Sequence, residues 1–187
     1  MTDPFAHDHA RSDELILVDA LDRPIGQASK ERCHREGLLH RAFSVVLVRE
    51  GAAGPELLLA RRAPGKYHSS GLWANSCCSH PRADEQLVDA VERRVPEELG
   101  VRAQELHEIA RFVYRASFGT GLAEYEYDHV LLGRCQEEPR PDPSEVDATR
   151  WVGSEELARE LAAHPERFAA WALTVLPLAL AALSGRA

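Results

Sequence analysis

A cysteine and a histidine two residues apart, Cys78 and His80, open the most reactive stretch of this sequence. In an extended segment, side chains two positions apart point to the same side of the backbone. Pro81 favours that extended geometry because it disfavours the helical region for the residue before it. A thiol and an imidazole are groups that can move protons or bind a metal. The pair therefore predicts a site where both groups face the same way.

An acidic helix is predicted directly after this pair, from the spacing of apolar residues between positions 87 and 99. The apolar positions are Leu87, Val88, Val91 and Val95, and glutamates stand among them at Glu85, Glu92, Glu97 and Glu98. Gly100 suits the end of the helix. Pro96 lies inside the pattern, where it removes one backbone hydrogen bond. We expect it to kink the helix and displace Glu98.

A second reactive pattern occurs in a predicted strand, Leu122–Gly133, which has Glu124, Glu126 and Asp128 on one face. Adjacent like charges repel, so Glu124 and Glu126 require a cation between them or a proton on one of them. Three histidines complete a set suited to Zn²⁺ or Mn²⁺, whereas Mg²⁺ prefers more oxygen ligands. These histidines are His34, His40 and His80. The alternative is an exposed strand with solvated glutamates and three unrelated histidines.

The charge distribution restricts the kinds of partner. The net charge is −8, and no basic run is present, so nucleic acid is not an expected partner. An acidic protein that binds a phosphate ester needs local cations or a bridging metal. The segment RRAPGKYHSS at residues 61–70 supplies such cations through Arg62 and Lys66, although it also fits a solvated surface loop.

The remaining patterns predict one α+β domain over residues 14–187, with a mixed sheet flanked by helices. Strands are predicted at 15–20, 41–48, 56–60, 108–117 and 149–152, with a hairpin turn at 51–55, and helices near 154–163 and 165–183. Residues 1–13 are polar and expected to be disordered. No signal pattern precedes the domain, and the apolar run 171–183 is too short to cross a bilayer. We therefore expect a cytoplasmic protein without a membrane partner and with four free cysteines.

Several segments together resemble a known family. They are HREGLLHRAFSVVLV, LLLARRAPGK, GLWANSCCSHP and LAEYEYDHVLL, in this order. They resemble type I isopentenyl-diphosphate isomerases, and the likeness extends from about Leu15 to the last helix. The resemblance implies a Nudix-like fold, an α/β/α sandwich, and an enzyme of isoprenoid biosynthesis. Such an enzyme interconverts isopentenyl and dimethylallyl diphosphate through protonation, a tertiary carbocation and deprotonation, as a monomer or weak dimer.

The resemblance also implies roles for individual residues. Cys78 and Glu126 match the catalytic pair, Tyr114 a tyrosine that hydrogen-bonds the catalytic glutamate, and Trp171 an aromatic residue of the hydrocarbon pocket. One divalent metal (Mn²⁺, Zn²⁺ or Mg²⁺) is implied at His34, His40, His80, Glu124 and Glu126. Lys30, Arg62 and Lys66 match residues that hold the diphosphate, and Glu98 matches the ligand of a second ion, Mg²⁺, bound to that diphosphate.

The sequence departs from the pattern of Nudix hydrolases at two positions. Ser79 stands where that pattern has a glycine, and Arg94 stands where it has a glutamate; the pattern is matched at Glu85, Arg93, Glu97, Glu98 and Gly100. Loss of the carboxylate at Arg94 weakens a hydrolytic cluster of metal ions and favours the isomerase. The open alternatives are a diphosphate hydrolase, a member of the family redirected to another prenyl diphosphate, and an inactive metal-binding module.

Overall fold

The structure is a computed structural model that describes residues 14–66, 68–119 and 121–185. The tail predicted at residues 1–13 therefore lies outside the described residues. The elements are β1 (Glu14–Val18), β2 (Pro24–Ser29), α1 (Lys30–Glu36), β3 (His40–Gly51), β4 (Gly54–Arg62), β5 (Trp73–Ala74), β6 (Cys77–Ser79), α2 (Leu87–Leu99), β7 (Gln104–Phe118), β8 (Leu122–Arg134), β9 (Val146–Gly153), α3 (Ser154–Ala163), the 3₁₀ turn Pro165–Arg167 and α4 (Ala172–Leu183).

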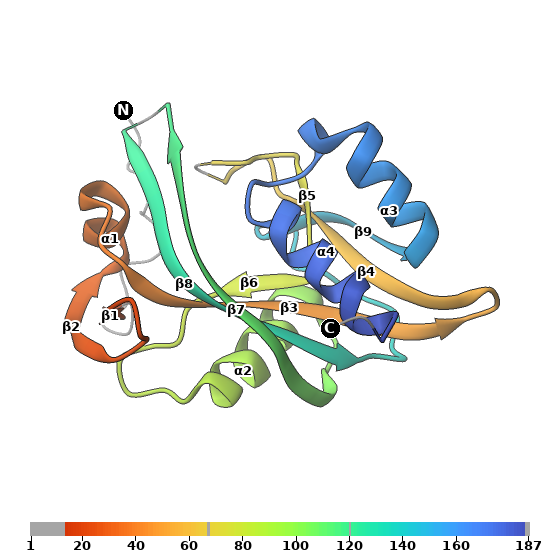
Figure 1. The fold of residues 1–187 in the computed structure, drawn as a ribbon, viewed down its shortest axis with the longest axis horizontal. Coiled ribbons are helices and arrows are strands. Elements are labelled where there is room, and N and C mark those ends of the chain that lie inside the picture. The colour runs from red at the N-terminus through yellow and green to blue at the C-terminus, as the bar shows by residue number, and fades with distance from the viewer. Residues whose placement is uncertain (1–13, 67, 120, 186–187) are drawn as a thin grey trace.

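Strand β3 is the centre of a mixed sheet (Figure 1). It pairs with β8 in parallel and with β1, β4 and β6 in antiparallel orientation. Its β-branched run is buried on both faces, as expected for a strand covered by helices on both sides. The hairpin predicted between residues 41–48 and 56–60 is confirmed by the antiparallel register of β3 and β4.

Helices cover the two faces of the sheet with separate apolar cores. Phe43, Val45 and Leu47 of β3 pack with the buried face of α2. Val46 and Val48, which alternate with them, pack with α3 and α4 on the opposite face. In Figure 1 helix α2 lies below the sheet, and α3 and α4 lie above it. The predicted α/β/α sandwich is confirmed, because the alternation along β3 supplies an apolar side chain to each helical layer.

The predicted C-terminal helix begins later than expected. Residues 165–183 form a 3₁₀ turn, an extended break and then α4. The break has a tertiary cause: Phe168 pairs with Trp73 of β5, and the Ala169 N–H donates to the Trp73 carbonyl at 2.9 Å. Sequence analysis also left β2 and α1 unassigned. None of the helices in the described part of the chain combines the length and apolar character needed to cross a bilayer.

Helix α2 continues through Pro96 to Leu99, and Glu98 in its last turn lines the cavity. The Pro96 carbonyl accepts a 2.9 Å hydrogen bond from the Gly100 N–H. Gly100 adopts the left-handed conformation at φ 65°, which ends the helix as predicted. A Cβ atom at this position would lie 2.7 Å from the Arg140 carbonyl oxygen, so glycine is required here for space as well as for conformation.

Candidate active site and metal centre

Most of the predicted reactive residues line one cavity of about 590 Å³, whereas His34 and His40 lie outside its lining. Residues that can carry chemistry or bind a hydrocarbon form one group of its lining: Ser44, His68, Asn75, Cys78, His80, Tyr114, Glu124, Glu126 and Trp171. Cations form a second group: Lys30, Arg62, Lys66, Arg82, Arg93 and Arg94. The cavity therefore combines a reactive, partly aromatic region with a region suited to an anion.

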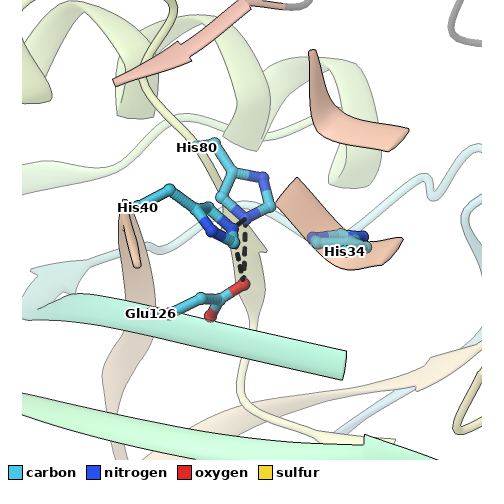
Figure 2. A group of neighbouring side chains, drawn as sticks. All are labelled: His34, His40, His80 and Glu126. Carbon is cyan, nitrogen blue, oxygen red and sulfur yellow. Dashed lines mark hydrogen bonds and ion pairs between the residues drawn. The ribbon is translucent and has the colours of Figure 1, made fainter. Parts of the chain in front are cut away.

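His34, His40, His80 and Glu126 form a compact cluster (Figure 2). One ligand atom from each lies within 4.8 Å of the others. The parallel register of β3 and β8 places His40 directly beside Glu126, and β6 delivers His80 from the other side of β3. Helix α1 contributes His34, whose ring lies 5.3 Å from that of His40. Four separate elements thus converge on a single point.

The hydrogen bonds and burial of this cluster favour the protonation states that bind metals. The carbonyl of Leu38 can only accept, so His40 donates to it from Nδ1 at 2.8 Å and keeps Nε2 available. Burial, together with the neighbouring His80 and His40, lowers the pKa of His34 to about 2. Burial also lowers the pKa of His80. Burial alone would raise the pKa of Glu126, but the two neighbouring histidines outweigh it and lower that pKa well below its ordinary value.

Neutral imidazoles and an ionised carboxylate are the forms that ligate a divalent metal. His80 Nε2 lies 2.9 Å from Glu126 Oε1, and His40 Nε2 lies 3.6 Å from the same oxygen. His40 Nε2 and His80 Nε2 lie 3.3 Å apart. A three-nitrogen, one-oxygen donor set of this kind fits Zn²⁺ or a similar ion. The residues therefore fit the metal that the sequence predicted.

Glu124 lies outside this group of four among the described residues, which departs from the expected ligand set. Its Oε2 accepts a hydrogen bond from the Tyr114 hydroxyl, and its Oε1 lies 2.8 Å from His68 Nε2. The expected bond from Tyr114 to Glu126 is therefore corrected. Tyr114 is paired with Glu126 in the register of β7 and β8, but its long side chain reaches diagonally to the carboxylate two residues away.

Cys78 and Cys77 leave β6 on opposite sides, as the predicted alternation requires. Cys78 Sγ lies 3.1 Å from Asn75 Oδ1 and 3.5 Å from Ser44 Oγ. The side chain of Cys77 instead packs in the core beneath α2. Burial raises the pKa of the Cys78 thiol, and the nearby Asp128 raises it further, so the thiol is neutral in this state.

Asn75 and Ser44 are contacts of Cys78 that sequence analysis did not identify. The Asn75 Nδ2 donates to the carbonyls of Val45 and Cys77, both at 3.1 Å, which turns Oδ1 toward the sulfur atom. Ser44 donates at 2.8 Å to Asp128, a residue that the predicted strand face did include. Asparagine and serine carry no spacing signal of their own. Asn75 stands three residues before Cys78, whereas the pairing of β3 with β6 sets Ser44 opposite Cys78.

The predicted anion-binding residues Lys30, Arg62 and Lys66 all line the cavity. The Arg62 guanidinium lies 5.2 Å from the centre of the Trp171 ring, and Lys66 forms an ion pair with Glu145. Glu98 is buried, which raises its pKa, and its Oε1 accepts a hydrogen bond from Arg94. Arg94 was not predicted to be part of the site. Its position four residues before Glu98 on α2 is the signal that could have placed it there.

Comparisons with known proteins identify the family of the chain. The NUDIX domain model matches residues 38–172. A protein of Photobacterium profundum named isopentenyl-diphosphate Delta-isomerase is 46% identical over 176 residues, 93% of this chain and 98% of that protein. The chain belongs to this isomerase family and carries a NUDIX domain.

Other members of the family show a similar likeness. A protein of the same name from Burkholderia multivorans is 49% identical, over 85% of this chain and 88% of that protein. "Isopentenyl-diphosphate Delta-isomerase 2" of Aromatoleum aromaticum is 45% identical, over 85% of this chain and 82% of that protein. His34 and Lys30 precede the residues matched by the NUDIX model, so α1 completes the cluster from outside that match.

Solved structures support the fold independently. The crystal structure of DR0079 from Deinococcus radiodurans has a TM-score of 0.69 and 23% sequence identity, over 88% of this chain and 97% of that chain. A MutT NUDIX hydrolase from Burkholderia pseudomallei has a TM-score of 0.59 and 20% identity, over 75% of this chain and 97% of that chain. At these identities the likeness concerns the fold alone.

Proposed function

We propose that the chain interconverts isopentenyl diphosphate and dimethylallyl diphosphate, with Cys78 and Glu126 as the proton-transferring pair. The observation that carries this proposal is the presence of a neutral thiol and an ionised carboxylate in the wall of one cavity that also has a cationic region. The substrate has the same two parts, a reactive alkene and an anionic diphosphate. The membership of the chain in the isomerase family supports the same reaction.

The double bond moves by one carbon through two proton transfers. One member of the pair adds a proton to C4 of the alkene, which leaves a tertiary carbocation at C3, and the other removes a proton from C2. The roles exchange in the reverse reaction. Trp171 supplies an aromatic face for the cation, a contact worth about 2 kcal/mol in a dry site. Lys30, Arg62 and Lys66 hold the diphosphate, so that the alkene is positioned for the transfer.

His34, His40, His80 and Glu126 would hold one divalent metal, Zn²⁺, Mn²⁺ or Mg²⁺. When bound, that ion supplies positive charge beside Glu126. Glu98 is proposed to hold a second ion, Mg²⁺, with the diphosphate, in exchange for its present contact with Arg94. Glu124 is proposed to act with Tyr114 at the reactive end of the cavity and to join the metal ligands if its carboxylate turns toward the cluster.

Hydrolysis of a diphosphate is the competing reaction on this fold. It is disfavoured by Arg94, a cation at the position where the hydrolase pattern has a carboxylate, and by its hydrogen bond to Glu98. Both features favour holding the diphosphate over cleaving it. A hydrolase also has no use for a thiol in the wall of its cavity.

The reaction run in D₂O tests the proposal directly. Protonation from solvent-exchanged groups should place deuterium in the new methyl group of dimethylallyl diphosphate, while the P–O–P linkage stays intact. Glu126→Gln should abolish the exchange, because an amide cannot shuttle the proton. Release of phosphate or pyrophosphate in step with turnover, with no deuterium in the carbon skeleton, would assign the chain to the hydrolases.

We further propose that the enzyme works in the cytoplasm as a monomer or weak dimer, on a small prenyl diphosphate and without nucleic acid or membrane partners. The net charge of −8 supports the absence of a nucleic-acid partner. Light scattering across a range of concentrations tests the oligomeric state.

A further inference from the structure

His68 lies in the wall of the cavity, although the sequence indicated only a cationic loop for this segment and no role for the histidine. It is only 7% exposed. Arg62 and Lys66 of the same loop also line the cavity. The loop therefore contributes an aromatic ring to the site as well as cations.

The His68 ring is held on several sides. It stacks on Phe118 with the ring centres 4.1 Å apart and an angle of 12° between the planes. It meets the edge of Trp171 at 5.9 Å and 90°. Its Nε2 lies 2.8 Å from Glu124 Oε1, and its backbone carbonyl accepts a 3.3 Å hydrogen bond from Arg62 Nε. A ring with these contacts cannot swing aside without losing several of them together.

We propose that His68 is a specificity-determining residue, whose ring limits the size of the alkyl group beside the double bond to that of a five-carbon substrate. This inference rests on the proposed function. The ring stands next to Trp171 and Glu124, at the part of the cavity assigned to the alkene. A packed wall with fixed contacts has no room for an extra methylene group. A substrate with a larger alkyl group must therefore distort the wall or bind in a less productive position.

The other aromatic walls are less suited to setting this limit. Trp171 is part of the core formed with α4, so its removal would disturb the packing of the helix. Phe118, in contrast, is a half-buried residue at the end of β7, beyond the cavity lining. Removing the His68 ring therefore extends the cavity toward Phe118 and leaves the core intact.

A homologue of isopentenyl diphosphate with an ethyl group in place of the C3 methyl group provides the test. One methylene typically changes kcat/KM by about 10–200-fold when a pocket excludes it. The unmodified enzyme should therefore prefer the five-carbon substrate by at least about tenfold. His68→Ala should reduce this preference by about tenfold or more, whereas His68→Phe should keep it, because phenylalanine preserves the stacked ring and loses only the polar contacts with Glu124 and Ser69.

Two further variants make the test decisive. His107→Ala, at an exposed histidine of β7, should leave the preference unchanged. If circular dichroism shows that His68→Ala is unfolded, His68→Asn takes its place as a second truncation that keeps a polar side chain. Equal preferences in the truncated and unmodified enzymes would overturn the inference, and so would a loss of preference in His68→Phe. Failure of the unmodified enzyme to isomerise the five-carbon substrate would instead overturn the proposed function.

Discussion

Cys77 and Cys78 are neighbours in the chain, yet their sulfur atoms lie in different environments. Cys78 contacts Asn75 and Ser44, whereas Cys77 packs in the core beneath α2 and borders the cavity beside Glu98. His80 lies in the cavity wall with Cys78. At the scale of the residue, the direction in which a strand projects each side chain decides which groups can take part in chemistry.

Replacing each cysteine separately tests this assignment. Cys78→Ala should lower kcat by several orders of magnitude, because it removes one of the two proton-transferring groups. Cys77→Ala is the matched control and should change kcat by less than about tenfold, equivalent to about 1.4 kcal/mol. Steady-state kinetics with isopentenyl diphosphate measures both. If Cys77→Ala proved the more damaging change, the proposed roles of the two thiols would be wrong.

The metal cluster makes a separate prediction. Purified protein should hold about one tightly bound divalent transition metal, and His80→Ala should lose the metal and the activity together. Elemental analysis after gel filtration measures the metal content independently of activity. The exposed His164 offers a matched control, since His164→Ala should retain both. Full activity in protein shown to be free of metal would contradict the prediction.

At the scale of the element, the end of α2 contributes both to the stability of the fold and to the lining of the cavity. Arg94 and Glu98 lie on the last turns of this helix and line the cavity. Gly100 ends the helix, and the chain passes close to Arg140 at this point. A substitution at Gly100 should therefore lower the stability of the protein. It should also weaken diphosphate binding, because the end of α2 carries Arg94 and Glu98.

Gly100→Ala should destabilise the protein by at least about 1–2 kcal/mol, because alanine is strained in the left-handed conformation. Its Cβ would also lie 2.7 Å from a carbonyl oxygen. Each kcal/mol corresponds to a decrease of about 2–4 °C in Tm for a protein of this size. KM for the diphosphate substrate should rise with little change in kcat.

Gly153→Ala provides the control for this experiment. Gly153 precedes α3 with φ −66°, and a Cβ atom there would meet nothing within 4 Å. Thermal unfolding of the two variants should therefore differ clearly. Equal Tm values would show that the close approach at Gly100 relaxes without cost.

At the scale of the whole molecule, buried ionisable groups connect the site to folding. His34 is buried at the junction of α1 with the sheet, and its pKa is lowered to about 2. In the unfolded chain the same histidine titrates near its ordinary pKa of about 6.5. Between these values the unfolded state binds more protons than the folded state, so lowering the pH favours unfolding.

Metal-free protein should accordingly lose stability as the pH falls below about 6.5, by up to about 1.4 kcal/mol per pH unit for each such group. His80, whose pKa is also lowered, should contribute in the same direction. Glu126 loses its contribution only below its ordinary unfolded pKa of about 4.3. Glu98 and Asp128, whose pKa values are raised, act in the opposite direction, so urea unfolding at about pH 7 and about pH 5 gives the net effect, and a histidine variant is needed to isolate His34.

His34→Gln tests the source of this dependence. The variant should be less stable than the unmodified protein at about pH 7, but it should lose less stability on acidification. The unfolding free energies of both proteins at the two pH values give the comparison. Identical losses in the two proteins would exclude His34 as a source of the dependence.

The sequence by itself determined the features that depend on local periodicity. The alternation of Cys78 with His80, the faces of the strand that carries Glu124 and Glu126, the hairpin of β3 and β4, and the bounds of α2 and α3 all follow from side-chain spacing of 2 or about 3.6 residues. The resemblance of several motifs to one family added the expected activity. Each of these signals lies within a short stretch of chain.

Only the tertiary structure decided which of these groups touch one another. Glu126 joins three histidines because the parallel register of β3 and β8 sets it beside His40, whereas Glu124, on the same face, contacts Tyr114 and His68. The contacts of Ser44 with Cys78 and of Phe168 with Trp73 likewise join separate segments. Such contacts depend on register and on the reach of side chains between neighbouring elements, and no periodicity within one segment encodes them.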